Sequence, residues 1–142
     1  MEIRRLTTSN YKELIELWSK ASLPFKPQGR DSKETIAKQI SANPDFFIGA
    51  FEDGCLAGAA ILSSDLRKGW INRLAVDPCY RRRGVAEALI KESERILRKH
   101  DLRVFCALIE DSNVVSKTLF KKCGYVEHHD ILYFSKRDDD MV

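Results

Sequence analysis

The spacing of apolar residues changes along the chain, and each change predicts the border of a secondary-structure element. A short strand is predicted over 2–6. Two helices follow, and their apolar positions repeat at helical spacing: Tyr11, Leu14, Ile15 and Trp18 in the first, Ile36 and Ile40 in the second. Pro24 and Pro44 end these helices, because proline disfavours the helical conformation in the residue before it.

Three strands are predicted next. Phe46–Phe51 and Cys55–Leu62 are apolar runs joined at Asp53-Gly54. This dipeptide indicates a hairpin, because a type I′ turn needs positive φ at both of its central residues. Trp70–Val76 is the third strand, and Pro78 ends it because proline donates no ladder hydrogen bond.

The last part of the chain alternates helix and strand. Gly84–Lys99 is amphipathic with helical spacing, and Leu102–Ile109 is apolar at nearly every position, as in a central strand covered on both faces. Asp111 or Ser112 is expected to cap a further helix that ends near Gly124. A final strand is predicted over Tyr125–Phe134. The expected order is β-α-α-β-β-β-α-β-α-β, an α/β fold with a mixed sheet, because a strand-helix-strand unit requires a parallel pair while hairpins are antiparallel.

The chain length fits one domain over residues 1–142. There are 24 Lys and Arg against 21 Asp and Glu, a net charge of +3. The positive charge is concentrated between Arg67 and Arg83, a stretch that contains six Lys and Arg residues and one acidic residue, Asp77. This charge pattern predicts that the segment binds an anionic ligand.

Cysteine and histidine patterns argue against a disulfide framework and against a metal site. Four cysteines are widely spaced without a Cys-x-x-Cys pair, and the three histidines have no metal-ligand spacing. Reduced thiols and the absence of an apolar leader in 1–10 predict a cytoplasmic protein. The longest apolar stretch, Cys55–Ser64, is far shorter than the ~20 residues of a membrane span, so no membrane partner is expected.

Three consecutive arginines, Arg81, Arg82 and Arg83, directly precede a predicted helix start. The helix dipole already places about half a positive charge there, so an anion should compensate. Gly84 permits close backbone approach, and the first helical turn offers unpaired N–H groups that suit a phosphate or pyrophosphate. Alternatively, the arginines extend into water and pair with carboxylates such as Glu87, or they bind a nucleic-acid backbone.

The stretch from Leu74 through Asp77-Pro78 to Arg81-Arg82-Arg83-Gly84-Val85-Ala86 resembles motif A of the GNAT N-acetyltransferase superfamily, whose signature is Arg/Gln-x-x-Gly-x-Gly/Ala. A long amphipathic helix follows it, and a second block from Asn113 to Gly124-Tyr125 stands at the family's usual distance. The resemblance implies an acetyl-CoA-dependent N-acetyltransferase that uses no metal and moves an acetyl group to a primary amine. A non-catalytic acetyl-CoA sensor and a small nucleic-acid-binding module are the alternatives.

The resemblance also assigns cofactor contacts. Acetyl-CoA would lie between the strands Trp70–Val76 and Leu102–Ile109. The residues expected to bind it are Leu74, Ala75 and Val76 through the backbone beside the pantetheine arm; Arg81, Arg82, Arg83, Gly84, Val85 and Ala86 around the pyrophosphate; and Asn113 and Phe120 in the last helical block. Phe120 stands where many members have a tyrosine that protonates the leaving thiolate.

Catalytic groups are less well defined by the resemblance. Glu110 is the first candidate for the general base, Asn72 for holding a water or the acceptor, and Tyr133 for an acid or a substrate contact. Phe25 and Arg30, between the first two helices, are candidates for selecting the acceptor, which is a small molecule or a protein amine. The protein is expected to be a monomer or a homodimer.

Overall fold

A five-stranded mixed sheet forms the centre of the molecule, with the strand order β1-β2-β3-β4-β5. The computed structural model describes all residues from 1 to 142. The strands are β1 (Glu2–Arg5), β2 (Phe47–Glu52), β3 (Cys55–Ser64), β4 (Gly69–Val76) and β5 (Phe105–Cys106). The first four pair antiparallel, whereas β4 and β5 are parallel. The predicted α/β class with a mixed sheet is confirmed.

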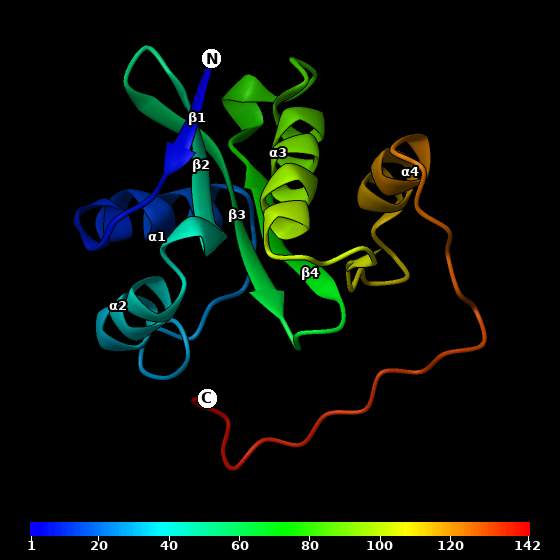
Figure 1. Cartoon of the computed structure of the whole chain (residues 1–142). Coiled ribbons are helices and arrows are strands. Elements are labelled where there is room, and N and C mark those ends of the chain that lie inside the picture. Colours follow the sequence, from blue (N-terminus) through cyan, green and yellow to red (C-terminus); the bar gives the residue numbers. More distant parts are fainter.

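Helices cover both faces of the sheet (Figure 1). They are α1 (Tyr11–Lys20), α2 (Lys33–Ala42), α3 (Val85–Lys99) and α4 (Val114–Lys122), with single 3-10 turns at Thr8–Asn10, Pro44–Phe46 and Pro78–Tyr80. No helix is both long enough and apolar enough to span a membrane. Asn113, rather than Asp111 or Ser112, caps α4, and its Oδ1 accepts from the Ser116 N–H at 3.1 Å.

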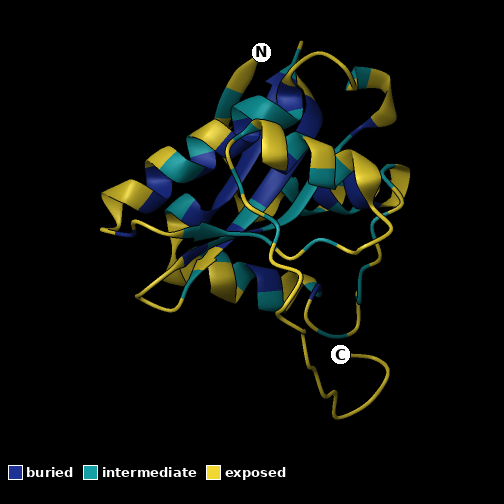
Figure 2. Ribbon diagram, turned by 90° about the vertical axis from the view of Figure 1, so that its right-hand side faces the viewer, coloured by how far each residue is buried: buried dark blue, intermediate teal, exposed yellow.

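Two apolar cores lie on the two sides of the sheet, and buried ribbon segments lie between the helices and strands (Figure 2). Ile48 and Leu89 belong to the core under α3. Phe47 and Trp18 belong to the core under α1 and α2. Neighbours in β2 therefore point to opposite faces, and the apolar run of this strand fills both cores. The turn that follows β2 has φ values of 49° at Asp53 and 81° at Gly54, which confirms the predicted hairpin.

A β-bulge interrupts β4 at Arg73. Ile71 packs in the core under α3, but Ala75, four residues later, packs under α1 and α2. Residues an even number apart share a face in a regular strand, so an additional residue must lie between them. The register with β3 shifts at this point, and Arg73 adopts a φ of 53°. The bulge brings Arg73 to the α1 side of the sheet, where its guanidinium lies over the Trp18 ring.

Gly58 of β3 allows α3 to lie close to the sheet. A Cβ at this position would lie 2.9 Å from Val85 Cγ1 and 3.0 Å from the Ala75 carbonyl oxygen. Both distances are shorter than ordinary van der Waals contact, and the second neighbour is backbone that cannot rotate away. The absent side chain therefore sets the height of the first turn of α3 above β3.

Two sequence predictions were wrong. The strand predicted over Leu102–Ile109 forms only at Phe105–Cys106, and the strand predicted over Tyr125–Phe134 does not form. A strand exists only where a neighbour pairs with it, and β5 pairs with β4 at just two positions. The segment after Gly124 runs as an arc away from the sheet (Figure 1), so its strand-like composition has no partner within the chain.

Candidate active site

The parallel strands β4 and β5 separate after their first residues. Only Gly69 with Phe105 and Trp70 with Cys106 are paired. Beyond Ile71, β4 therefore has a neighbour on its β3 side alone. This divergence leaves one backbone edge of β4 available to a ligand.

The pairing with β3 decides which residues of β4 face that open edge. The Asp77 N–H donates to the Ala57 carbonyl at 2.8 Å, on the β3 side. Alternate residues of an antiparallel strand bond to the same neighbour, so Ala75 also faces β3. The peptide groups of Leu74 and Val76 then face the open edge. Leu74 and Val76 are two of the three residues whose backbone was expected beside the pantetheine arm, whereas the peptide groups of the third, Ala75, face β3.

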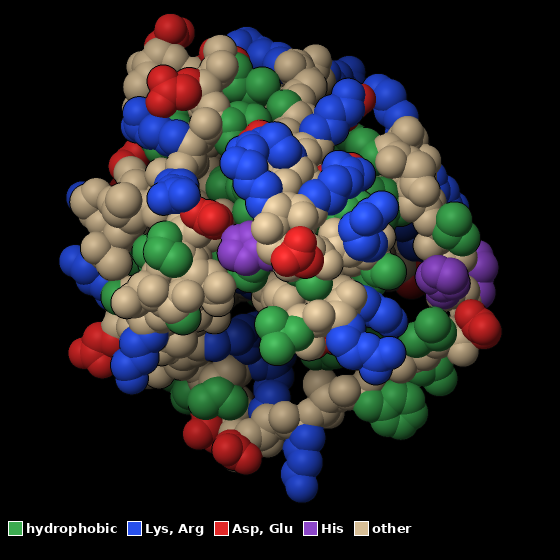
Figure 3. Space-filling view, viewed as in Figure 1, with side chains coloured by type: hydrophobic (Ala, Val, Ile, Leu, Met, Phe, Trp, Pro, Cys, Tyr) green, Lys and Arg blue, Asp and Glu red, His purple; other side chains and the backbone are tan.

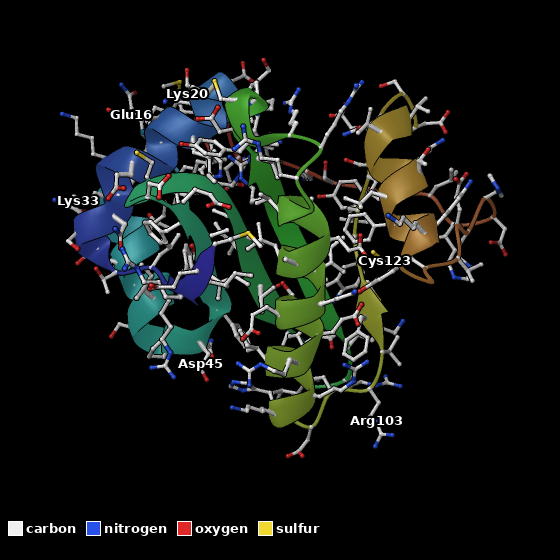
Figure 4. The ribbon with its side chains drawn as sticks, turned by 90° about the horizontal axis from the view of Figure 1, so that it is seen from above. Glu16, Lys20, Lys33, Asp45, Arg103 and Cys123 are labelled. Carbon is white, nitrogen blue, oxygen red and sulfur yellow. The ribbon has the colours of Figure 1, made fainter.

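The loop from Asp77 to Gly84 is held firmly at its start. The buried Asp77 carboxylate accepts from the Cys79 N–H at 2.9 Å through Oδ1 and lies 3.6 Å from Lys20 Nζ through Oδ2. Figure 4 shows Lys20 at the end of α1, beside this loop. A pocket of about 380 Å³ lies between α1, the β2–β3 turn and the loop, with Glu13 and Tyr80 in its lining.

The backbone before α3 forms an anion-binding geometry. Arg82 and Gly84 have positive φ values of 64° and 78°, and the turn and cap hydrogen bonds of the chain include none donated by the N–H groups of residues 82–87. No side chain caps α3. Consecutive N–H groups of this kind, at the positive end of a 15-residue helix, attract phosphate oxygens.

The three arginines of this loop have no carboxylate partner. Arg81, Arg82 and Arg83 are exposed and form no ion pair, although the Arg83 guanidinium lies 5.5 Å from the centre of the Tyr80 ring. Glu87, the carboxylate expected as their alternative partner, pairs instead with Lys122 and Lys91, and these hydrogen bonds lower its pKa. The positive charge of the loop is therefore uncompensated within the chain.

The two candidate cofactor-binding residues at α4, Asn113 and Phe120, both make contacts that stabilise the fold. Asn113 is exposed and caps the helix. Phe120 is buried under α3, and its ring meets the Tyr125 ring edge-on with centroids 5.0 Å apart. The Tyr125 hydroxyl donates to Glu94 Oε2 at 2.7 Å. Burial and this contact raise the pKa of Tyr125, so its hydroxyl stays protonated.

The structure does not gather the three catalytic candidates. Glu110 is exposed beyond β5, and its carbonyl accepts from the Asn113 N–H at 2.9 Å. Asn72 lies in β4 and donates to Ser63 Oγ at 2.8 Å. Tyr133 lies in the exposed C-terminal segment. Their catalytic roles stay predictions.

The sequence analysis missed a polar cluster on the α1 side of the sheet. Arg73 Nη2 lies 3.7 Å from Oδ2 of the buried Asp31, which also accepts from the Lys26 N–H at 2.7 Å. The guanidinium lies 4.3 Å from the centre of the Trp18 ring, and its Nε and Nη2 have no hydrogen-bond partner. Burial lowers the pKa of Arg73, and Asp31 partly offsets this effect.

This cluster connects the proposed acceptor-selecting segment to the strand at the cleft. Phe25 lies 6.3 Å from Trp18 between ring centroids, and Arg30 is exposed next to Asp31. The sequence contained a signal for the bulge, although not for the contact with Asp31. The apolar residues of β4 at 71, 74 and 76 break the two-residue alternation, which indicates a bulge.

An open strand edge beside a helix start with unpaired N–H groups has the shape and polarity that suit an extended, phosphorylated ligand. Comparison with known proteins identifies the class of protein. Residues 11–125 match the Acetyltransferase (GNAT) family. An acetyltransferase of Photorhabdus laumondii is 30% identical over 96% of this chain and 95% of its own length. An acetyltransferase of Sodalis glossinidius is 28% identical over the same shares.

Solved structures show the same fold. PaiA N-acetyltransferase from Thermoplasma acidophilum in complex with coenzyme A has a TM-score of 0.74 and 25% identity, covering 86% of this chain and 87% of that one. Aminoglycoside N-acetyltransferase AAC(6')-Iy in complex with coenzyme A has a TM-score of 0.76 and 20% identity, covering 96% and 94%. The chain belongs to the GNAT acetyltransferase family, and it is an N-acetyltransferase.

Proposed function

We propose that this enzyme transfers the acetyl group of acetyl-CoA directly to a primary amine. The observation that carries the proposal is the pair of backbone surfaces at the cleft: the open edge of β4 and the unpaired N–H groups of residues 82–87. The coenzyme A bound by PaiA from Thermoplasma acidophilum and by AAC(6')-Iy supports it.

The residues present fit such a cofactor. Peptide groups of Leu74 and Val76 would pair with the amide-containing pantetheine arm, as an added strand does. The N–H groups of residues 82–87 would hold the pyrophosphate, and Arg81–Arg83 would add charged donors. The buried Phe120 ring would contribute apolar packing, and Asn113 would offer its amide N–H₂ group, since only its oxygen serves the helix cap.

The chemistry requires positioning more than covalent machinery. The amine nitrogen forms a bond with the carbonyl carbon of the thioester, the carbon–sulfur bond breaks, and the sulfur leaves as a thiolate that takes up a proton. An N–H group of β4 would stabilise the negative charge that develops on the carbonyl oxygen. Before the attack, the ammonium of the acceptor would lose one proton to Glu110, directly or through water, and the proton that the nitrogen loses after the attack would pass to the thiolate.

Removing the three arginines should weaken the binding of acetyl-CoA. The triple variant Arg81→Ala, Arg82→Ala, Arg83→Ala is expected to raise the Kd by roughly 100-fold, because hydrogen bonds to charged groups contribute about 1.5–3 kcal/mol each and some compensation by the backbone remains. A thermal-shift titration with acetyl-CoA measures it. Lys12→Ala, Lys33→Ala, Lys38→Ala removes the same charge from α1 and α2 and should leave the Kd within about twofold. An unchanged Kd in the arginine variant would remove these side chains from the proposed site.

Phe120→Tyr tests whether a hydroxyl at this position assists the leaving thiolate. We expect turnover, measured as release of free thiol from acetyl-CoA, to stay the same or rise. The buried hydroxyl should lower the free energy of unfolding by about 1–2 kcal/mol if it lacks a partner. A folded variant without turnover would show instead that Phe120 is needed for packing against the cofactor.

The acceptor is to be identified with a panel of primary amines in the thiol-release assay. The acceptors named for structural neighbours, an aminoglycoside and an alanine of ribosomal protein S18, mark the range to cover with small molecules and peptides. Release of thiol that depends on the amine supports an enzymatic function, whereas acetyl-CoA binding without thiol release in the presence of any amine would favour a sensor.

The four unpaired cysteines are typical of a reducing compartment and support a cytoplasmic location.

A further inference from the structure

Three buried N–H groups on the α1 side of the sheet have no hydrogen-bond acceptor. They are Nε and Nη2 of Arg73 and Nε1 of Trp18, and no other buried side-chain nitrogen or oxygen of the chain lacks a partner. The Arg73 guanidinium lies over the Trp18 ring, so all three donors belong to one contact. Buried donors in native proteins are nearly always paired, and a group of unpaired ones indicates a polar ligand at that place.

The two unpaired donors of Arg73 lie on the same edge of its guanidinium group. Nε–H and one N–H of Nη2 point in parallel directions, and this fork matches the two oxygens of a carboxylate. A single carbonyl oxygen would not satisfy both donors equally well. The chemistry of the edge therefore favours an anion with two oxygens side by side.

Asp31 does not fill this fork, although it is the one carboxylate that forms an ion pair with Arg73. Its Oδ2 lies 3.7 Å from Nη2, which is too far for a hydrogen bond, and already accepts from the Lys26 N–H at 2.7 Å. The Asp31 carbonyl also accepts from the Tyr11 hydroxyl at 2.8 Å. These two bonds hold Asp31 where it supplies charge but no hydrogen bond, so the fork stays free.

The surroundings of the fork are positively charged. Arg30 lies close enough to Arg73 to lower its pKa, and Asp31 offsets only one of the two positive charges. The acidic residues 138–140 of the C-terminal end form no ion pair with either arginine. One net positive charge suits a monoanionic carboxylate better than a phosphate dianion, which the nearby Asp31 would repel more strongly.

The fork lies next to the part of β4 where the thioester would be. Arg73 directly precedes Leu74, whose peptide group faces the open edge, and its side chain lies on the face of the sheet away from α3. The side chain is 20% exposed, and residues 21–32, which pack against it, contain no helix or strand. Figure 3 shows a hollow between the body of the molecule and the C-terminal arc, with Lys and Arg side chains inside it. A small ligand thus has a way to this face.

We propose that Arg73 selects the acceptor by binding a carboxylate on it through Nε and Nη2, so that the amine substrate is an amino acid. This inference rests on the proposed transfer of acetyl to a primary amine and names the class of that amine. The Trp18 ring fixes the plane of the guanidinium, and the bound carboxylate holds the amine at the open edge of β4. Polycationic amines lack the anion and are repelled by both arginines.

Pairs of amines that differ only in charge test the proposal in the thiol-release assay. Glycine, β-alanine and γ-aminobutyrate are each compared with their own primary amide, while O-phosphoethanolamine and putrescine represent a phosphate and a polycation. We expect kcat/KM for the best amino acid to exceed that for its amide by roughly 10- to 100-fold, as hydrogen bonds to a charged group provide. Equal or faster turnover of the amides, of putrescine or of O-phosphoethanolamine would overturn the proposal.

Substitutions of Arg73 assign the preference to the fork. Arg73→Met keeps an unbranched chain over Trp18 and should raise the KM for the amino acid by roughly 10- to 100-fold, with the KM for the amide and the Kd of acetyl-CoA within about twofold. Arg73→Lys keeps the charge beside Asp31 and secures a folded variant, but it should lose most of the preference because an ammonium cannot form the parallel pair. Arg4→Met removes a guanidinium that lies 3.9 Å from the centre of the Phe51 ring on β1, and this matched control should change nothing.

A binding measurement separates this inference from the proposed acetyl transfer. The three amino acids are titrated in the presence of coenzyme A, with thermal stability as the readout, for the unaltered protein and for Arg73→Lys. Binding that Arg73→Lys abolishes supports the fork even if no amine releases thiol, an outcome that would refute the transfer alone. Thiol release without any preference for amino acids leaves the transfer standing and refutes the inference, as does the absence of amino-acid binding.

Discussion

Replacing Gly84 by alanine is expected to weaken acetyl-CoA binding by roughly tenfold or more, with a small loss of stability. Gly84 has a φ of 78°, where a Cβ costs about 1–2 kcal/mol, and the space around it is open, so no steric clash adds to that cost. If the loop relaxes to avoid the strain, the N–H groups of residues 82–87 lose their common direction. If it does not relax, the methyl group projects into the space where the backbone would approach phosphate.

Gly54→Ala is the matched control. Gly54 has a φ of 81° and equally open surroundings, but it lies in the β2–β3 turn. The two variants should therefore lose similar free energy of unfolding in urea, while only Gly84→Ala changes the Kd of acetyl-CoA in a thermal-shift or calorimetric titration. Equal affinities in the two variants would contradict the assignment of the loop before α3 as the phosphate site.

Removing the Asp31 carboxylate is expected to give the largest loss of stability. Asp31→Ala leaves the half-buried Arg73 guanidinium without its counter-charge and frees the Lys26 N–H. Breaking one partner of a buried pair costs about 3–5 kcal/mol, and the partial exposure of Arg73 places the expected loss near the lower limit. Urea unfolding measures the change. The segment between α1 and α2 should also loosen, which would raise the KM for the amine more than the KM for acetyl-CoA.

The double variant Asp31→Ala/Arg73→Met separates the charge from the packing. Methionine keeps an unbranched chain over the Trp18 ring without a charge, so at least half of the lost stability should return. Lys91→Ala breaks the exposed pair with Glu87 and serves as the control, with an expected effect below about 0.5 kcal/mol. Additive losses in the double variant would show that the two side chains do not interact.

Local signals in the sequence were sufficient to predict the elements that surround the proposed cofactor site. The Asp53-Gly54 turn, the proline after β4 and the amphipathic pattern of α3 each depend on nearby residues, and all three occur in the structure. The free N–H groups before α3 followed from the same local reasoning, since the first turn of any helix lacks intrahelical acceptors.

The sequence did not predict contacts between segments that are far apart in the chain. Leu102–Ile109 and Tyr125–Phe134 have strand composition, but composition does not specify a neighbour, and the first pairs at two residues while the second pairs at none. The contact between Asp31 and Arg73 joins residues far apart in the chain through a bulge, so neither residue alone indicated it. The identity of the catalytic base could not be predicted for the same reason, because it depends on which carboxylate the folded chain brings to the amine.

The absence of a side chain at Gly58 affects which cofactors this enzyme can accept. The residue touches neither loop nor ligand, yet it sets the distance between the first turn of α3 and the sheet that contains Leu74 and Val76. In the proposed binding mode those two elements hold opposite ends of one extended ligand, so their separation limits the distance between the phosphate and the thioester that the site can accept. A single methyl group at position 58, on the face of the sheet that α3 covers, would change that distance without altering a proposed binding residue.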